Sequence, residues 1–165
     1  MKGLDGLSFR PARPDDLTDI AELHGRSVAG LSASTLDERQ LAASAAMGKT
    51  EAYRQDLARS NLMLAISPEG EIVGSAGWIE ADGEPGTGRI RKVFVDPRYA
   101  RRGLATRLVS DAEARARKAG CRRFMVRSSL LAVPFYETLG YRRKKAGTMP
   151  SAGGVELPVV LMEKP

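Results

Sequence analysis

The chain is poor in cysteine and histidine, with one of each among 165 residues. The single cysteine, Cys121, cannot form an internal disulfide, so we expect a reducing compartment and a cytoplasmic protein. One cysteine and one histidine also fall short of the ligand sets of typical structural zinc sites. We therefore expect no metal site.

Long apolar runs are missing as well. No stretch approaches the roughly 18 consecutive apolar residues of a membrane span, and the first six residues lack the apolar run of a secretory signal. We expect no membrane partner. The chain is 42% hydrophobic and 28% charged, as in an ordinary globular protein. This length and composition predict a single domain spanning residues 1–165.

Aromatic residues are scarce, at 5%, while 26 basic residues outnumber 20 acidic ones. The resulting net charge of +6 favours an anionic partner, either nucleic acid or a phosphorylated small molecule. Because the basic residues are not interleaved with aromatic ones and no recognition motif is present, we expect no nucleic acid. A basic nucleic-acid-binding module is the least favoured alternative, and the sequence leaves a homodimer open.

What is present is a regular succession of strand and helix patterns. The expected strands span residues 7–10, 62–67, 71–80, 89–95, 123–128, 141–149 and 155–162. The first expected helix starts near residue 14. Four further helices are expected over residues 36–47, 50–59, 104–119 and 133–139, the first of these with a capping box at Thr35 and Glu38. The strand–helix–strand unit from 89 to 128 implies a parallel pair. The sequence thus predicts an α/β fold: a mixed, mostly antiparallel sheet of about seven strands with a central parallel strand pair, flanked by helices.

The segment from Arg98 to Thr106 lies between an expected strand end and an expected helix start. Free backbone amides point outward at such a start, and the helix dipole adds about half a positive charge. Gly103 has no side chain that would keep a pyrophosphate away from these amides. Arg101 and Arg102 add long-range attraction. The segment is a candidate anion site, and a helix start with merely solvated arginines is the alternative.

Two motifs around this segment resemble the GNAT superfamily of N-acetyltransferases. The first is Val95-Asp96-Pro97 followed by Arg101-Arg102-Gly103-Leu104-Ala105 and a helix. The second runs from Ser129 to Tyr141, where the family usually reads Asn-x-x-Ala-x-x-Phe-Tyr-x-x-x-Gly-Phe/Tyr. Both occur in the family's order, and the resemblance covers residues 89–142. It implies acetyl-CoA as the co-substrate.

The resemblance also implies roles for individual residues. The backbone of Val93, Phe94 and Val95 would bond the pantetheine arm, in a slot where this strand splays from the following one. The pyrophosphate would be held by the amides of Arg101, Arg102, Gly103, Leu104, Ala105 and Thr106. Tyr136 matches the family tyrosine that can return a proton to the departing thiolate.

Two positions depart from the family's pattern. The first position of the pyrophosphate loop, usually Gln or Arg, is Ala100. Since the loop binds mainly through backbone amides, we expect weakened rather than lost binding. The position that usually holds Asn in the second motif is Ser129, which keeps a hydroxyl with shorter reach.

A general base is harder to find. Direct transfer needs a neutral amine, so an ammonium substrate needs a proton acceptor. The family often supplies a glutamate on the strand before the pyrophosphate loop, where this chain has Arg89, Arg91 and Lys92. Glu80, at the end of the preceding strand, is the best substitute, with an exposed strand-end charge as its alternative role. His24 ends an apolar helical stripe, which favours a packing role.

The leading function is direct transfer of an acetyl group from acetyl-CoA to a primary amine of a small molecule or protein. A GNAT-like domain that binds acyl-CoA without catalysis is the alternative, since the strand glutamate is missing. In the family, the acceptor site is built by segments that correspond to residues 24–60 and 142–155. Polar candidates there are Ser27, Ser32, Ser34 and Tyr53, and Arg91 would favour a carboxylate-bearing amine.

Overall fold

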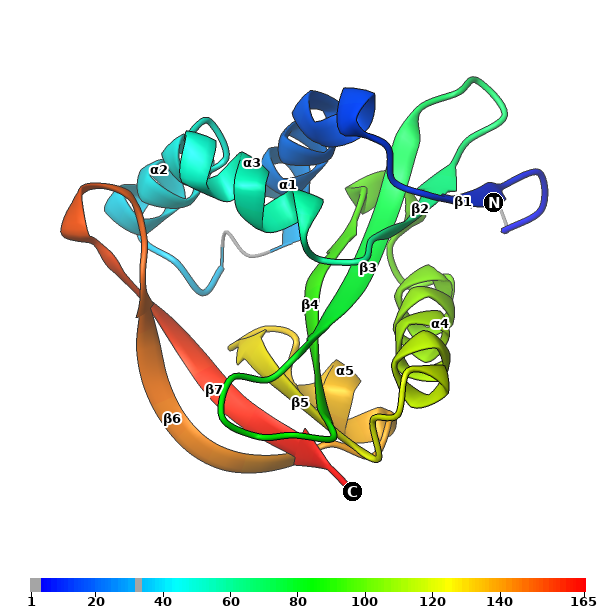
Figure 1. Ribbon diagram of the computed structural model, residues 1–165. Helices are drawn as coiled ribbons and strands as arrows, with labels where there is room; N and C mark the ends of the chain where they lie inside the picture. Colours follow the sequence, from blue (N-terminus) through cyan, green and yellow to red (C-terminus); the bar gives the residue numbers. More distant parts are fainter. Residues whose placement is uncertain (1–3, 32–33) are drawn as a thin grey trace.

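The computed structural model describes residues 4–31 and 34–165, and its centre is one seven-stranded sheet (Figure 1). The strand order is β1-β2-β3-β4-β5-β7-β6. Neighbouring strands are antiparallel except β4 and β5, which are parallel and are connected through a helix, α4. The expected mixed sheet with a central parallel pair is therefore confirmed.

The elements follow the expected order along the chain. The strands are β1 (Ser8–Pro11), β2 (Met63–Ile66), β3 (Ile72–Glu80), β4 (Thr87–Val95), β5 (Arg123–Ser129), β6 (Arg142–Pro150) and β7 (Glu156–Lys164). The α-helices are α1 (Leu17–Leu31), α2 (Glu38–Met47), α3 (Glu51–Ala58), α4 (Leu104–Lys118) and α5 (Val133–Thr138). Short 3-10 turns are η1 (Pro14–Asp16), η2 (Pro97–Tyr99) and η3 (Ala152–Gly154). Each expected strand and helix is found, with bounds shifted by a few residues at most.

One expected feature is wrong. The capping box of α2 is formed by Asp37 and Gln40 rather than by Thr35 and Glu38. The Asp37 carboxylate accepts a hydrogen bond from the Gln40 amide at 2.7 Å, and the Gln40 side chain accepts one from the Asp37 amide at 3.0 Å. Aspartate caps a helix as well as threonine does, so the pattern alone does not separate the two registers.

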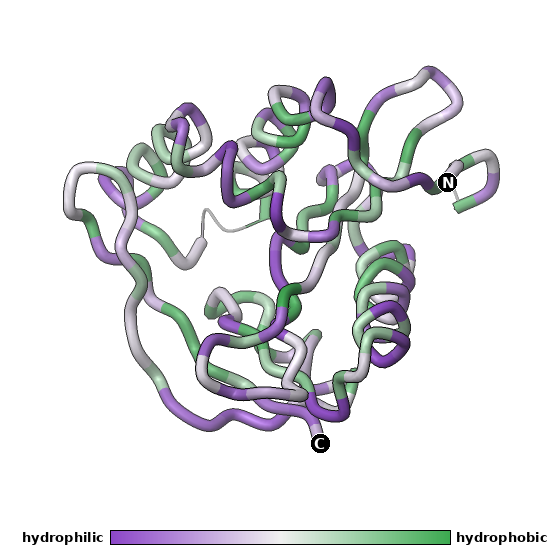
Figure 2. Tube along the Cα trace, in the orientation of Figure 1, coloured by the Kyte–Doolittle hydropathy of each residue, from purple (hydrophilic) through white to green (hydrophobic). Residues whose placement is uncertain are grey.

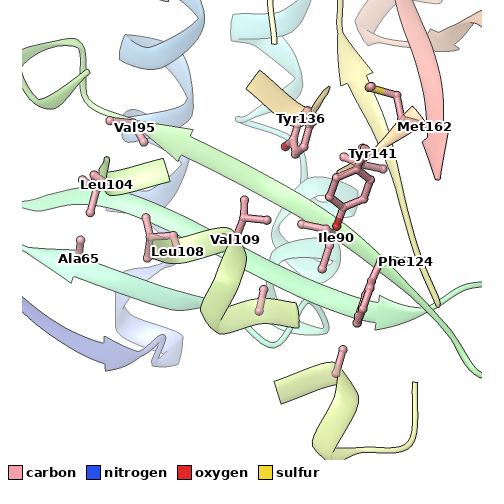
Figure 3. Close-up of a cluster of buried hydrophobic side chains, with 14 of the residues drawn as sticks. Ala65, Ile90, Val95, Leu104, Leu108, Val109, Phe124, Tyr136, Tyr141 and Met162 are labelled. Carbon is pink, nitrogen blue, oxygen red and sulfur yellow. The ribbon is translucent and has the colours of Figure 1, made fainter. Parts of the chain in front are cut away.

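Two hydrophobic cores lie on the two faces of the sheet. On one face, α4 packs its apolar stripe (Leu104, Leu108, Val109, Ala112 and Ala116) against the central strands, in the cluster drawn in Figure 3. On the other face, α1 and α3 cover β2 and the start of β3 through Ile20, Leu23, Tyr53 and Leu57. In Figure 2, α4 alternates between hydrophobic and hydrophilic residues, as expected of a helix with one buried face.

The second face is only partly covered. The β6–β7 hairpin bends over it toward α2, and Gln40 Nε2 donates a hydrogen bond of 3.3 Å to the Glu156 carbonyl (Figure 1). On this face, residues of β4, β5, β6 and β7, together with the end of β3 and the β3–β4 connection, line an open cavity. We call this side of the sheet the acceptor face.

Candidate active site

The sheet splits between its two parallel strands. Pairing of β4 with β5 runs only from Thr87 with Arg123 to Ile90 with Val126. Beyond Ile90, β4 stays paired with β3 as far as Val95, whereas β5 stays paired with β7. Figure 1 shows the two strands diverging along this stretch. The edge of β4 that carries Val93, Phe94 and Val95 therefore lacks a β5 partner and can accept an extended ligand.

A β-bulge lies at the start of this split. Ser75 pairs with Phe94 and Gly77 with Arg91, so Lys92 and Val93 together face one residue of β3. Lys92 has a left-handed backbone, with φ of 56°. The bulge interrupts the alternation of β4, and the side chains of Arg91 and Lys92 both reach Asp56 on α3.

The loop after β4 presents a row of backbone amides. Arg101 and Gly103 have left-handed backbones, with φ of 59° and 83°, and Gly103 is the N-cap of α4. The first intrahelical bond runs from the Arg107 amide to the Gly103 carbonyl at 3.0 Å. The amides of Leu104, Ala105 and Thr106 therefore lie in the first turn, where no intrahelical acceptor is available. This arrangement is suited to a pyrophosphate.

Buried contacts fix the position of this loop. Asp96, 1% exposed, accepts hydrogen bonds from the amide and guanidinium of Arg98 and from Arg26. Although burial opposes ionisation, the Arg98 hydrogen bonds lower the pKa of Asp96, so its carboxylate is charged at neutral pH. Below the helix start, a Cβ on Gly74 would lie 2.8 Å from a methyl of Leu108. Glycine at this position thus lets α4 approach β3 closely.

Tyr136 lies on α5, at the end of the cluster nearest Tyr141 and Met162 (Figure 3). Its ring packs edge-on against Phe135 and Tyr141, with centroids 5.0 Å and 5.5 Å away. Burial raises the pKa of Tyr136, so the phenol stays protonated at neutral pH. Tyr141 differs from it, because the Tyr141 hydroxyl donates a hydrogen bond of 2.7 Å to the buried carboxylate of Glu113.

The structure does not bring Glu80 to the split. Glu80 pairs with Gly88 at the far end of β3, two positions before the last β4–β5 pair. Its neighbours Ile79 and Ala81 line the cavity on the acceptor face, so alternation directs Glu80 to the opposite face. Its charge there helps to raise the pKa of Cys121, after the larger effect of burial. This geometry does not favour Glu80 as the base, and its role as a base stays a prediction.

Ser129, at the end of β5, is exposed and pairs with Val159 of β7. Its carbonyl accepts hydrogen bonds from the Ala132 amide at 3.2 Å and from the Ser128 hydroxyl at 2.8 Å. These bonds hold the turn that leads into α5. Ser129 therefore lies past the last residue of β5 that pairs with β4, and its contact with a cofactor stays a prediction.

His24 is an internal packing residue. Its ring stacks on Phe94 with centroids 4.2 Å apart, and its Nδ1 lies 2.5 Å from the Tyr53 hydroxyl. Burial, and then the charge of Lys92, lower the pKa of His24 to about 4, so the ring is neutral at neutral pH. Of the other polar candidates, Ser27 is buried and Ser34 is exposed. Ser32 lies outside the described residues.

The acceptor face carries a cavity of about 440 Å³. Its cationic lining residues are Arg89 of β4, Arg127 of β5 and Lys145 of β6. Burial, and then the charges of Arg91 and Arg127, lower the pKa of Arg89 to about 10. The guanidinium of Arg89 is thus still charged at neutral pH.

Two possible features are not found in the part of the chain that the structure describes. No group of three or more His, Cys, Asp and Glu residues is placed to hold a metal ion. No helix there is both long enough and apolar enough to cross a membrane.

Comparison with known proteins agrees with this geometry. A family model described as an acetyltransferase (GNAT) domain matches residues 32–157, which is more than half of the chain. The chain belongs to the GNAT acetyltransferase family. The glucosamine 6-phosphate N-acetyltransferase of Trypanosoma brucei brucei is 39% identical to this GNAT chain over 79 residues, which are 46% of the chain and 54% of that protein. The alignment thus spans about half the length of this curated relative.

Solved structures resemble the whole GNAT chain. A GCN5-related N-acetyltransferase from Rhodopseudomonas palustris matches with a TM-score of 0.84 and 25% identity, over 99% of this chain and 98% of that one. The PaiA N-acetyltransferase of Thermoplasma acidophilum, in complex with coenzyme A, matches with a TM-score of 0.76 and 16% identity, over 96% and 98%. The second likeness concerns the fold alone.

The main site feature that the sequence patterns did not reveal is that Arg89 of β4 and Arg127 of β5 line the same cavity. Strand alternation was available as a signal, since Phe124 and Val126 are buried in the core under α4, whereas Met125 and Arg127 line the cavity on the other face. Whether Arg89 and Arg127 reach the same cavity depends on the register between β4 and β5. A local sequence pattern does not contain that register.

Proposed function

We propose that this chain is an acetyl-CoA-dependent N-acetyltransferase that moves an acetyl group directly to a primary amine, within a single domain spanning residues 1–165. The observation that carries the proposal is the parting of β4 from β5 after Ile90, with the open first turn of α4 at the wide end of the split. Membership of the GNAT family and the likeness to a coenzyme A complex support it.

In this proposal, the backbone of Val93, Phe94 and Val95 bonds the pantetheine arm along the free edge of β4. The pyrophosphate is held by the amides of Arg101, Arg102, Gly103, Leu104, Ala105 and Thr106. Ser129 lies across the split at the end of β5 and contacts the same arm. A cytoplasmic location is part of the proposal, since Cys121 is buried and unpaired as a reducing compartment permits.

The reaction replaces a carbon–sulfur bond by a carbon–nitrogen bond and moves one proton from nitrogen to sulfur. The amine nitrogen bonds to the acetyl carbon while the carbon–sulfur bond breaks, and the nitrogen loses a proton while the sulfur gains one. Tyr136 donates the proton to the sulfur, since its buried phenol is protonated at neutral pH and its position matches that of the family tyrosine. The phenolate then recovers a proton from solvent.

The amine enters the reaction as the free base. The acceptor face near the split carries Arg89, Arg91, Lys92 and Arg127, and cations nearby disfavour an ammonium ion. Asp56 is a poor proton acceptor there, because three cations hold its carboxylate: Arg59, Arg91 and Lys92. Burial acts to raise the pKa of Asp56, but the hydrogen bond from Lys92 outweighs burial and the pKa is lowered. We infer that the amine proton is lost to water rather than to a dedicated side chain.

The acceptor is a small molecule. A cavity of about 440 Å³ accommodates a ligand of that size, and the relative that acts on glucosamine 6-phosphate makes this amine a first candidate. Binding of acyl-CoA without catalysis is the second candidate function, favoured by the missing strand glutamate.

A turnover screen tests the proposal. The protein is mixed with acetyl-CoA and one amine at a time: glucosamine 6-phosphate, amino acids, polyamines, aminoglycosides or short peptides. We expect thiol release and a product heavier by one acetyl group with at least one amine. Coenzyme A binding by calorimetry without turnover on any amine would favour the non-catalytic alternative, and loss of both would refute the proposal.

A further inference from the structure

The cavity on the acceptor face lies beside the point where β4 and β5 separate. The last pair of these strands is Ile90 with Val126. Arg89 precedes Ile90 and Arg127 follows Val126, and both line the cavity. Under the proposed function, the thioester carbon and the attacking amine meet at this split. The two arginines are therefore next to the reacting nitrogen.

Positive charge is concentrated at this place. Burial, and then the charges of Arg91 and Arg127, lower the pKa of Arg89. Burial also lowers the pKa of Arg91, against the opposing effect of Asp56, and Arg59 and Arg127 add to that lowering. The carboxylate that neutralises part of this charge, Asp56, is shared among Arg59, Arg91 and Lys92. A single negative charge cannot balance these cations, and buried like charges destabilise a fold.

Several donors in this group are left without acceptors in the described structure. The Nε of Arg89, and the Nε and Nη1 of Arg91, are buried and make no hydrogen bond there. The Arg91 side chain is only 8% exposed. An unpaired buried donor destabilises the fold, and a charged donor does so more strongly. Guanidinium groups present two parallel donors that match the oxygens of a carboxylate or phosphate.

Acids line another part of the cavity. Asp82 and Glu84 belong to the β3–β4 connection, beyond the ends of both strands. Gly86 and Ile90 are four positions apart along the chain, so at about 3.3 Å per position the connection ends more than about 10 Å from the split. These acids line the end of the cavity that lies away from the split.

We infer that the acceptor is a small primary amine carrying an oxyanion, carboxylate or phosphate, and that Arg89 and Arg127 bind this oxyanion with added charge from Arg91. The inference rests on the proposed function and names its substrate class. Polyamines and lysine-rich peptides are repelled by the same charges.

The test uses matched pairs of amines with and without the anion. Glucosamine 6-phosphate is compared with glucosamine for the phosphate, and glycine with glycinamide for the carboxylate. We expect kcat/KM for one anionic member to exceed that of its neutral partner by about tenfold or more. The amine pair with the larger ratio of kcat/KM values, anionic over neutral, shows whether the site prefers a phosphate or a carboxylate.

Variants assign the effect to the cavity. Arg89→Gln and Arg127→Gln should bring the anionic-to-neutral ratio close to one, whereas Arg122→Gln, which removes the same charge from an exposed loop residue, should keep the wild-type ratio. Arg127 is exposed, so its variant is expected to fold even if Arg89→Gln does not. A wild-type ratio near one, or a ratio that Arg127→Gln leaves unchanged, overturns the inference.

A binding measurement separates this inference from the proposed function. The protein is saturated with coenzyme A, so that the pyrophosphate loop is filled, and titrated with the same amines by calorimetry. Selective binding of the anionic members without any turnover would support the oxyanion site while the proposed activity fails. Turnover with no selectivity in rate or binding would leave the activity standing and overturn the oxyanion site.

Discussion

The hydroxyl of Ser75 on β3 donates a hydrogen bond of 2.7 Å to the carbonyl of Lys92, the bulged residue of β4. Ser75 is fully buried, and no residue of β5 pairs with Lys92 across the split. This bond therefore links the shape of the split to a side chain on the neighbouring strand.

Ser75→Ala removes this bond without adding volume. The Lys92 carbonyl then loses its buried donor, and we expect the free energy of unfolding to fall by about 1–2 kcal/mol. Coenzyme A affinity should fall as well, because the edge of β4 that carries Val93 is positioned by the bulge. Urea unfolding and calorimetry measure the two effects. Ser110→Ala, at an exposed position of α4, is the control and should change neither.

Gly103→Ala tests the pyrophosphate loop. Gly103 has a φ of 83°, and a Cβ there would meet no protein atom within 4 Å, so the substitution strains the backbone without a clash. Gly70 has a φ of 87° and similarly open surroundings, in the turn between β2 and β3. Both alanine variants should lose about 1–2 kcal/mol of stability. Only Gly103→Ala should weaken coenzyme A binding, by about tenfold or more, since its methyl lies where the pyrophosphate approaches. Equal affinities in the two variants would contradict the assigned site.

Much of this fold is predictable because its patterns are local. The stripe from Leu104 to Ala116 places one face of α4 in the core, and Gly103 marks the helix start. The family motifs extend this reading to the loop and to Tyr136. Contacts between elements cannot be predicted from local patterns alone, because they depend on the register between strands and on how helices pack on them.

Glu80 illustrates the limit. Its position at a strand end was predictable, but the face to which it points follows from how β3 packs under α4, with Trp78 in the core and Ile79 in the cavity. The bulge at Lys92 is similar, since a left-handed lysine is favoured by no local signal. Both features decide which charges surround the acceptor, and both arise from tertiary packing.

Glu80→Gln should therefore leave kcat/KM within about twofold of wild type, since its carboxylate faces away from the cavity. The pH dependence of kcat/KM should instead follow the acceptor, rising with pH as the amine loses its proton. Two acceptors whose amines differ in pKa should give profiles displaced by that difference. A fixed inflection that disappears in Glu80→Gln would restore Glu80 as the base.

His24 makes folding stability depend on pH. Its pKa is about 4 in the fold, against an ordinary value of about 6.5, so the unfolded chain binds the proton more readily. The neutral ring of His24 contributes its full share of the unfolding free energy above pH 6.5, and that share is lost as pH falls toward 4. The loss is about 3 kcal/mol at most. His24→Gln should flatten the fall in unfolding free energy between a pH of about 7 and about 4.5, measured by urea denaturation. An identical fall in variant and wild type would show that the ring does not titrate as described.

The two neighbouring tyrosines should separate catalysis from stability. Tyr136→Phe removes a proposed proton donor and should lower kcat by about 100-fold, the usual contribution of a positioned acid, with coenzyme A affinity unchanged. Tyr141→Phe instead removes the donor to Glu113, whose carboxylate also pairs with Lys164 at 3.1 Å. It should lower the unfolding free energy by about 1–3 kcal/mol and leave kcat near wild type. Steady-state kinetics and urea unfolding on both variants give the four values. If Tyr136→Phe loses stability but keeps its turnover, Tyr136 is a packing residue and the thiolate takes its proton from solvent.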